Sequence, residues 1–212
     1  MPRVVPEYKE EAKNRIVLAA GRVFSEKGYR QATMDDVAKK VGVSKGALYL
    51  YFASKEELFD ALCRSEPLAL RDILFSTFNE NRNYMESASE FFDKMVARYG
   101  SNYGLSFEIF SEASRNPSLK RSLRRTQEEY AKVLISFFEQ LREKGFIRKD
   151  SDLRSLTYAS IGLWNGIETL MVSGLPLPEA KDAWLEGFKA LFSHSASEAQ
   201  NPEPVTPETV RR

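Results

Sequence analysis

The feature that most constrains the fold is a close succession of helix stops and helix starts near the amino end of the chain. Gly28 and Gly42 suit the left-handed backbone conformation that ends many helices. Residues whose side chains can cap the start of a helix stand after these stops, at Thr33, Ser44 and Ser54. Glu57, three residues after Ser54, completes a capping box. The succession predicts helices over 7–27, 34–41 and 45–51, and a fourth that begins at 54.

The rest of the chain shows the same succession of helix starts and stops, and no part of it predicts a sheet. Breaks made of Asn, Gly and Pro separate further predicted helices: 84–99, 104–114, 117–144, 151–173 and 179–195. Pro67 is expected to kink or restart the helix that begins at 54. Residues 105–109 alternate in polarity as a strand would, but the sequence offers no second strand to pair with them. The prediction is therefore an all-α chain of about nine helices.

Composition narrows the chemistry that the chain can perform. Its 212 residues include a single cysteine, Cys63, and a single histidine, His194. These counts exclude an internal disulfide, a thiolate zinc cluster and any mechanism that needs two histidines, so neither a metal nor a cofactor is expected. Residues 155–178 carry only one charge, Glu168, but their polar and glycine content does not suit a membrane span. No secretory signal is visible, and a cytoplasmic protein is expected.

Charge is distributed unevenly along the chain. Residues 1–55 hold 11 Lys and Arg against 6 Asp and Glu, a net charge of +5. The remaining residues hold 20 basic against 24 acidic side chains, a net charge of −4. A basic front end on a slightly acidic body indicates a module that binds a polyanion.

Residues 33–52 have the pattern of a helix-turn-helix, which presents its second helix to the major groove of DNA. Residues with the spacing to pack the two helices together are Val37, Ala38, Val41, Val43 and Leu48. Residues left to face outward are Lys45, Gly46, Ala47, Tyr49 and Tyr51. A lysine can donate to guanine, and a tyrosine ring can contact a thymine methyl group. A three-helix bundle that only packs has the same spacing, so this pattern alone leaves both readings open.

The residues of this segment carry a specific resemblance. Gly28-Tyr29, then Ala32 to Ala38 (ATMDDVA), then Gly42 to Leu58 (GVSKGALYLYFASKEEL) resemble the DNA-binding domain of the tetracycline-repressor (TetR) family over roughly residues 8–63. The resemblance implies base contacts from Lys45, Gly46 and Tyr49. It implies phosphate contacts from Thr33, Ser44, Tyr51 and Lys55. Ala47 and Leu50 depart from the family, whose members often carry polar or aromatic phosphate-binding residues there.

The resemblance also implies a homodimer joined by the last two long helices. Gly162 and Gly166 form a GxxxG pattern that permits close backbone approach in a helix nearly free of charge. The final helix has a stripe of bulky residues on one side. The opposite side carries a stripe of small residues: Ala180, Ala183, Gly187 and Ala190. We therefore expect Gly162, Gly166, Ala183, Gly187 and Ala190 at the dimer interface. A monomer that buries both faces of the final helix is the alternative.

Family members commonly bind a small molecule among the helices of the body and release DNA when they do. Candidate pocket residues here are Met95, Tyr99, Phe107, Phe110, Phe138, Trp164 and Glu168, which would suit an apolar or aromatic effector. The same aromatic residues can equally belong to an ordinary core. Cys63 is expected to act as a small buried hydrophobic residue. The basic run Lys120, Arg121, Arg124 and Arg125 is expected to be a solvated helix face.

The predicted domain organisation has three parts. Residues 1–53 form a helix-turn-helix DNA-binding domain. Residues 54–195 form a helical ligand-binding and dimerisation domain, of which 54–66 is a linking helix. Residues 196–212 contain three prolines and form a disordered tail.

These observations lead to one functional hypothesis and three alternatives. The hypothesis is a dimeric, sequence-specific transcriptional regulator that binds double-stranded DNA at a palindromic operator, more specifically a repressor released by a small, largely apolar ligand. The alternatives are a DNA-binding protein without an effector, an adaptor that binds only proteins, and an enzyme that uses carboxylates. Nothing in the sequence places two acids in a cleft, and it contains no phosphate-binding glycine loop.

Overall fold

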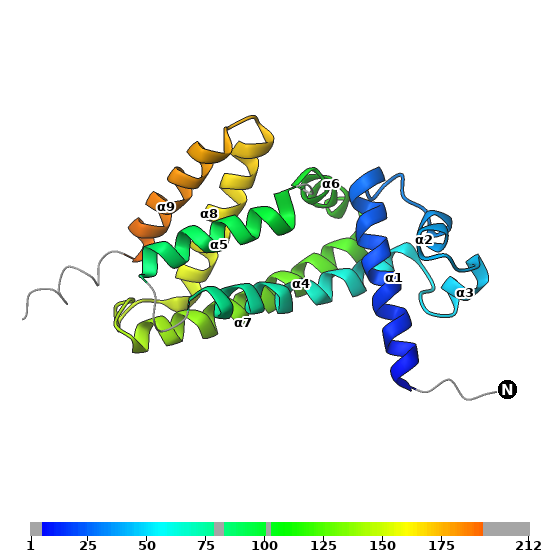
Figure 1. Ribbon diagram of the computed structural model, residues 1–212, viewed down its shortest axis with the longest axis horizontal. Coiled ribbons are helices and arrows are strands. Elements are labelled where there is room, and N and C mark those ends of the chain that lie inside the picture. Colours follow the sequence, from blue (N-terminus) through cyan, green and yellow to red (C-terminus); the bar gives the residue numbers. More distant parts are fainter. Residues whose placement is uncertain (1–5, 79–82, 101–102, 193–212) are drawn as a thin grey trace, which may run out of the picture. The chain divides into compact units, whose positions relative to one another are not determined.

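The computed structural model describes residues 6–78, 83–100 and 103–192, and in those ranges it consists of helices and short connections (Figure 1). The nine helices of the described ranges are α1 (Pro6–Lys27), α2 (Met34–Val41), α3 (Lys45–Tyr49), α4 (Lys55–Thr77), α5 (Tyr84–Tyr99), α6 (Tyr103–Ala113), α7 (Pro117–Glu143), α8 (Leu153–Val172) and α9 (Leu177–Phe192). The expected all-α class is confirmed. Residues 105–109 lie inside α6. The predicted tail, 196–212, and His194 lie outside the described residues.

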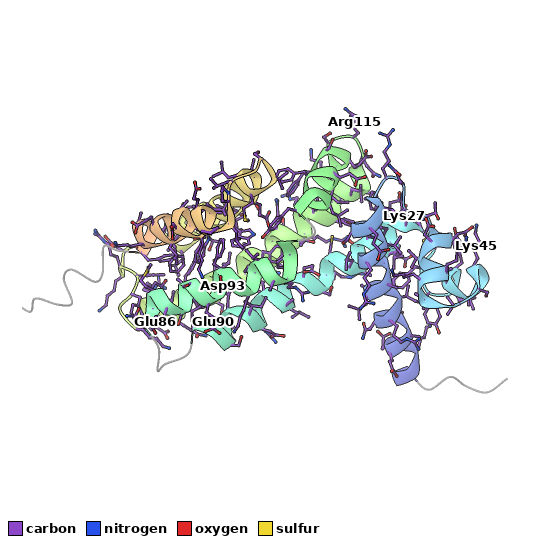
Figure 2. All side chains as sticks on the ribbon, turned by 45° about the horizontal axis from the view of Figure 1, so that its top comes forward. Lys27, Lys45, Glu86, Glu90, Asp93 and Arg115 are labelled. Carbon is purple, nitrogen blue, oxygen red and sulfur yellow. The ribbon has the colours of Figure 1, made fainter. Side chains whose placement is uncertain are left out.

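The predicted stops and caps at the amino end are present. Gly28 has a φ of 78° and Gly42 a φ of 82°, so both adopt the left-handed conformation. Thr33 and Asp36 form a reciprocal capping box at the start of α2. Lys27, at the end of α1 in Figure 2, donates to Asp36 Oδ1 over 2.5 Å. The hydrogen bonds from Lys27 and Thr33 lower the pKa of Asp36 to about 2.

The next two helices begin in a similar way. Ser44 Oγ accepts from the backbone N–H of Ala47 over 3.1 Å, and Ser54 Oγ accepts from that of Glu57 over 3.1 Å. The Glu57 carboxylate in turn accepts from the backbone N–H of Ala53. Each cap satisfies donors that a helix start would otherwise leave unpaired.

Pro67 was expected to kink or restart the helix that begins at 54, and it does not restart it. α4 runs as one helix from Lys55 to Thr77, past the expected end of the linking helix at 66. A proline inside a helix costs roughly 3 kcal/mol, because it removes one hydrogen bond and crowds the preceding turn. Pro67 itself is buried, as are Leu70 and Leu74 in the turns that follow, so burial of this face offsets that cost.

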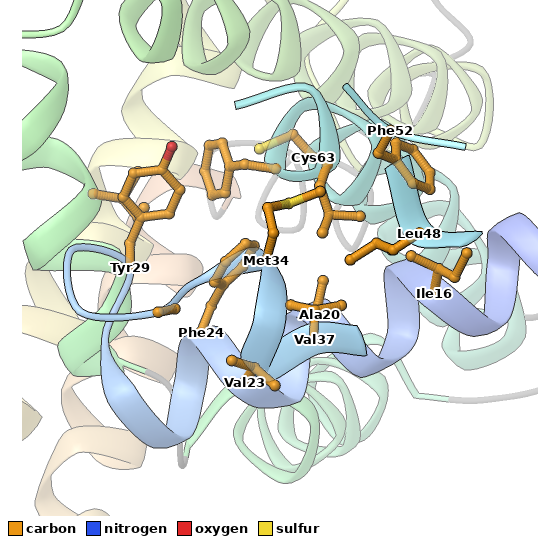
Figure 3. Close-up of a cluster of buried hydrophobic side chains, with 14 of the residues drawn as sticks. Ile16, Ala20, Val23, Phe24, Tyr29, Met34, Val37, Leu48, Phe52 and Cys63 are labelled. Atoms are coloured by element: carbon orange, nitrogen blue, oxygen red, sulfur yellow. The ribbon is translucent and has the colours of Figure 1, made fainter. Parts of the chain in front are cut away.

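The contacts divide the chain into two compact units, residues 1–133 and 134–212. In the first unit, α2 and α3 lie on one side of α1 and α6 on the other (Figure 1). One apolar cluster joins these helices, and Figure 3 shows its centre around Phe24, Val37 and Leu48. The same cluster includes Ile109 of α6 and Leu119 of α7. The core of the front helices therefore continues into α6 and α7. The domain boundary at residue 53 stays a prediction.

In the second unit, α8 and α9 pack side by side along their length. Trp184 stacks on Phe188 with ring centroids 4.9 Å apart, and Phe138 lies 5.3 Å from Phe192. A Cβ atom added to Gly187 would lie 2.8 Å from the side chain of Leu163. Glycine at 187 therefore allows α9 to approach α8 closely within one protomer.

Leu48 provides a test of this packing, with Leu50 as a matched control. Leu48 is fully buried, so Leu48→Ala is expected to lower the free energy of unfolding by about 2–5 kcal/mol. Leu50 is 82% exposed, so Leu50→Ala is expected to change it by less than about 0.5 kcal/mol. Urea titration followed by circular dichroism measures both changes. Equal destabilisation by the two substitutions would contradict the described core.

Candidate nucleic-acid interface

α3 packs one side against the core and exposes the other. Leu48 is fully buried, whereas Tyr49 is 43% exposed and Lys45 and Gly46 are exposed. These three outward residues are those predicted to contact bases. They come from neighbouring turns of one short helix, so they share one surface.

Gly46 is not required by the packing of the chain itself. A Cβ atom added to Gly46 would meet no atom within 4 Å, and no positive φ is found at this position. The open space beside Gly46 lets another molecule approach the backbone of α3 closely.

Lys45 is held by a partner that the sequence did not reveal. Its Nζ atom lies 2.8 Å from Asp35 Oδ1 of α2, and this hydrogen bond raises the pKa of Lys45. The Lys45 side chain nevertheless remains largely exposed at the outer edge of the helical cluster (Figure 2). Asp35 therefore reduces the positive charge of the exposed face without burying the ammonium group.

The predicted phosphate-contact residues have different surroundings. Thr33 and Ser44 serve as helix caps, and the Thr33 hydroxyl already donates to Asp36 Oδ2 over 2.8 Å. Tyr51 is half-buried against the core. Nothing in the structure tests these contacts, which stay predictions.

Lys55 lies against the connection between α1 and α2. Its Nζ atom donates to the carbonyl oxygens of Tyr29, Ala32 and Arg30 at 2.8, 3.0 and 3.3 Å. It also lies 4.6 Å from the centre of the Tyr29 ring. An ammonium group has three N–H donors, so these acceptors can use all of them. A phosphate contact from Lys55, which stays a prediction, would have to replace one of these bonds.

Val43 is more exposed than its sequence pattern indicated, and Leu50 is exposed as well. Val43 was expected to pack between the helices, but it is 37% exposed, because it directly follows the left-handed turn at Gly42. Leu50 stands on the surface beside Tyr49 as an apolar side chain. An alternating or helical pattern cannot distinguish such a residue from a core residue when the helix has only five residues.

The basic run in α7 is partly neutralised by acidic neighbours. Arg125 pairs with Asp60 of α4, and Arg124 pairs with Glu128 over 3.1 Å. Asp60 also accepts from Ser122 over 2.7 Å. These ion pairs agree with the expectation of a solvated face rather than a second nucleic-acid patch.

The candidate pocket residues are divided between the two units. In the first unit Met95 is buried, Phe107 is half-buried and Phe110 is exposed. Tyr99 Oη donates to Glu66 Oε2 over 2.7 Å. The pocket itself stays a prediction.

In the second unit, Glu168, the one acidic residue of α8, has a partner on its own helix. Trp164 Nε1 donates to Glu168 Oε1 over 2.7 Å, and burial raises the pKa of Glu168. Phe138 is buried. Cys63 of the first unit is buried too, and this burial raises the pKa of its thiol to about 12.

The small residues predicted for a dimer interface also have different surroundings. Gly162 and Gly166 are exposed, and Cβ atoms added to them would meet nothing within 4 Å. Ala183 and Ala190 of α9 are exposed as well. Gly187 differs, because the side chain of Leu163 of the same chain occupies the space beside it.

No group of three or more His, Cys, Asp or Glu residues in the described ranges could hold a metal ion. Of the helices described, none has the length and apolar character needed to cross a bilayer.

Comparison with known proteins connects the interface to a family. Residues 16–62 match the profile of the bacterial regulatory proteins of the tetR family. The HTH-type transcriptional regulator YfiR of Bacillus subtilis is 29% identical over 68% of this chain and 70% of its own length. The HTH-type transcriptional activator FasR of Mycolicibacterium smegmatis is 34% identical over 47% of each chain.

A solved structure supports the fold. The transcriptional regulator FadR from Bacillus subtilis, in complex with stearoyl-CoA, has a TM-score of 0.66 to this chain at 22% identity. The likeness covers 85% of this chain and 97% of that one. The matched profile contains α2 and α3, together with every residue predicted to contact DNA. Residues 16–62 thus match the tetR family of bacterial regulatory proteins, and the relatives that the rest of the chain resembles are transcriptional regulators.

Proposed function

We propose that the chain is a homodimeric repressor that binds a palindromic operator through α3 and is released by a small, largely apolar ligand in the cytoplasm. The observation that carries the proposal is the exposed side of α3. Lys45, Gly46 and Tyr49 share this side, while Leu48 anchors the opposite side in the core. The match of residues 16–62 to the tetR family supports the general function, and the chemistry of these residues supports the contacts.

The three residues suit direct reading of base edges. The ammonium group of Lys45 can donate to O6 and N7 of guanine. The Tyr49 ring can contact a thymine methyl group, and the missing side chain of Gly46 lets the helix enter deeply. Thr33, Ser44, Tyr51 and Lys55 are proposed to position the protein on the phosphates. The hydroxyl of Ser44 accepts from Ala47, which leaves its proton for a phosphate oxygen.

The proposed dimer uses the exposed stripe of α8. Tyr158, Gly162, Gly166 and Leu170 follow one another at intervals of four residues, and all are exposed. Such a stripe covers one side of a helix, and its two glycines permit close approach of a second helix. A second copy of the chain fits best, since two identical reading helices match the two-fold symmetry of a palindrome with half-sites about 34–36 Å apart.

The proposed effector acts by changing the dimer. A ligand can shift DNA affinity only by its differential affinity for two arrangements of the protein. Stearoyl-CoA in the FadR neighbour supports a ligand with a long apolar part. Within the second unit, the buried Phe138 suits such a part, and Glu168 offers one carboxylate to a polar group. A ligand that favours the wrong separation of the two α3 helices would release the operator.

Lys45→Ala tests whether α3 is the recognition helix. It is expected to reduce the preference for the operator over a scrambled duplex by about 1–3 kcal/mol, because it removes a contact to a base edge. The operator is first selected by the parent protein from random duplexes, and affinities are measured by fluorescence anisotropy. Lys120→Ala, on the exposed face of α7, is the charge-matched control and should keep the preference. Unchanged preference in the Lys45→Ala protein would refute the proposed contact.

Asp35→Asn tests the ion pair on the DNA-binding face. The substitution removes a negative charge beside the phosphates and frees Lys45, so affinity for every duplex is expected to rise about two- to fivefold at low salt. The gain should shrink as the salt concentration rises. Weaker binding of all duplexes at low salt would contradict the role given to Asp35.

Gly166→Leu tests the dimer. A leucine at this exposed position should fit the protomer but block a second helix, so sedimentation should show a monomer with an unchanged helical spectrum. Gly104→Leu is the matched control, because Gly104 is also an exposed helical glycine with open space around it. A Gly166→Leu protein that stays dimeric would exclude this face as the interface.

A further inference from the structure

The connection between α1 and α2, residues 28–32, is bound from α6 by one carboxylate. The backbone N–H of Arg30 donates to Glu108 Oε1 over 2.7 Å, and that of Tyr29 donates to Glu108 Oε2 over 3.0 Å. Both oxygens are therefore used on neighbouring peptide groups. Hydrogen bonds to an ionised acceptor are stronger than those between neutral groups.

The carboxylate also lies close against the backbone of Gly28. A Cβ atom at Gly28 would lie 2.5 Å from Glu108 Oε2, which is far inside a normal contact distance. The left-handed φ of 78° already favours glycine at this position. Glycine at position 28 thus leaves room for Glu108, which a larger side chain there would displace.

Lys55 binds the same connection through its carbonyl oxygens. Lys55 donates to three backbone carbonyl oxygens of the connection, those of residues 29, 30 and 32. Glu108 accepts from two of its backbone N–H groups, those of residues 29 and 30. We call this arrangement the loop clamp: Glu108, Lys55 and residues 28–32. It joins α6 to the start of α4 through the backbone of the connection.

The loop clamp lies beside an apolar contact between the same elements. Ile109 and Ala113 of α6 belong to the core cluster that contains Phe24 of α1. Residue 32 leads directly to the Thr33 cap of α2. A displacement of α6 would therefore carry the connection with it and turn α2, against which α3 packs.

We propose that Glu108 is a positioning residue that fixes the DNA-binding helices to α6 and so holds each α3 at the angle that a two-half-site operator requires. This inference rests on the proposed function, because the angle matters only when two reading helices bind one duplex. Glu108 itself is given no contact with DNA. Its loss should affect binding at two half-sites together and spare binding at one.

Glu108→Gln tests the proposal with little change in size, and Glu112→Gln is the matched control. Glu112 lies one turn further along α6, and its substitution makes the same change in charge. In the Glu108→Gln protein, the new amide side chain keeps one acceptor oxygen but turns an N–H group toward the second backbone donor. Glu108→Ala, which removes both acceptors, should have the larger effect.

The first measurement is amide hydrogen exchange of the full chain without DNA. The amides of Tyr29 and Arg30 are expected to exchange at least about tenfold faster in Glu108→Gln than in the parent, because a hydrogen bond to a charged group is lost. Glu112→Gln should exchange as the parent does. Parent-like exchange at both amides in Glu108→Gln would overturn the clamp.

The second measurement compares a two-half-site duplex with a single half-site duplex. Glu108→Gln is expected to bind the two-half-site duplex about tenfold more weakly than the parent. Its affinity for the half-site duplex should stay within about twofold of the parent's, because only binding at two half-sites depends on the angle of both α3 helices. An unchanged ratio of the two affinities, whether both duplexes are bound equally more weakly or neither is, would overturn the positioning role. If the parent itself shows no preference for two half-sites, the proposed function fails, and the parent measurement separates that outcome from a failure of Glu108.

Discussion

A helix of five residues has no stability of its own in water, since one turn costs more chain entropy than its hydrogen bonds return. α3 therefore depends on burial of Leu48 and on the Ser44 cap. The outward position of Lys45 and Tyr49 follows from that single buried side chain. The proposed recognition of DNA thus depends on the core beneath α3 as much as on the residues proposed to contact bases.

That core is shared with the body of the protein. Ile109 of α6 and Leu119 of α7 pack in the same cluster as Phe24 and Leu48. Glu108 and Lys55 add a polar connection at its edge. A movement of α6 would therefore reach α2 and α3 through packed side chains and hydrogen bonds, which gives the proposed effector response a physical route within the first unit.

The parts of the fold that could be predicted from sequence are those decided by neighbours in the chain. Thr33, Ser44 and Ser54 cap helices through residues three positions away, so their roles could be predicted locally. Glu108 contacts residues 78 and 79 positions earlier, and no local pattern signals such a contact. The ion pair of Lys45 with Asp35 likewise depends on how two helices cross.

Pro67 and Gly187 illustrate the same limit of local patterns. Pro67 was expected to kink or restart a helix, but α4 continues through it, and the burial of this face in the folded chain offsets the local penalty. Gly187 stays a predicted dimer-interface residue, but its stripe of small residues alone cannot tell which helices will approach it. In the protomer one of them is α8, through Leu163.

The measurement that tests the central claim most directly is amide hydrogen exchange of the parent protein with and without its selected operator duplex. If α3 enters the duplex, protection should increase over residues 44–49 and at the starts of α2 and α4, with no change over the basic run at 120–125. Protection over 120–125 without any over 44–49 would show that DNA binds elsewhere and would contradict the account.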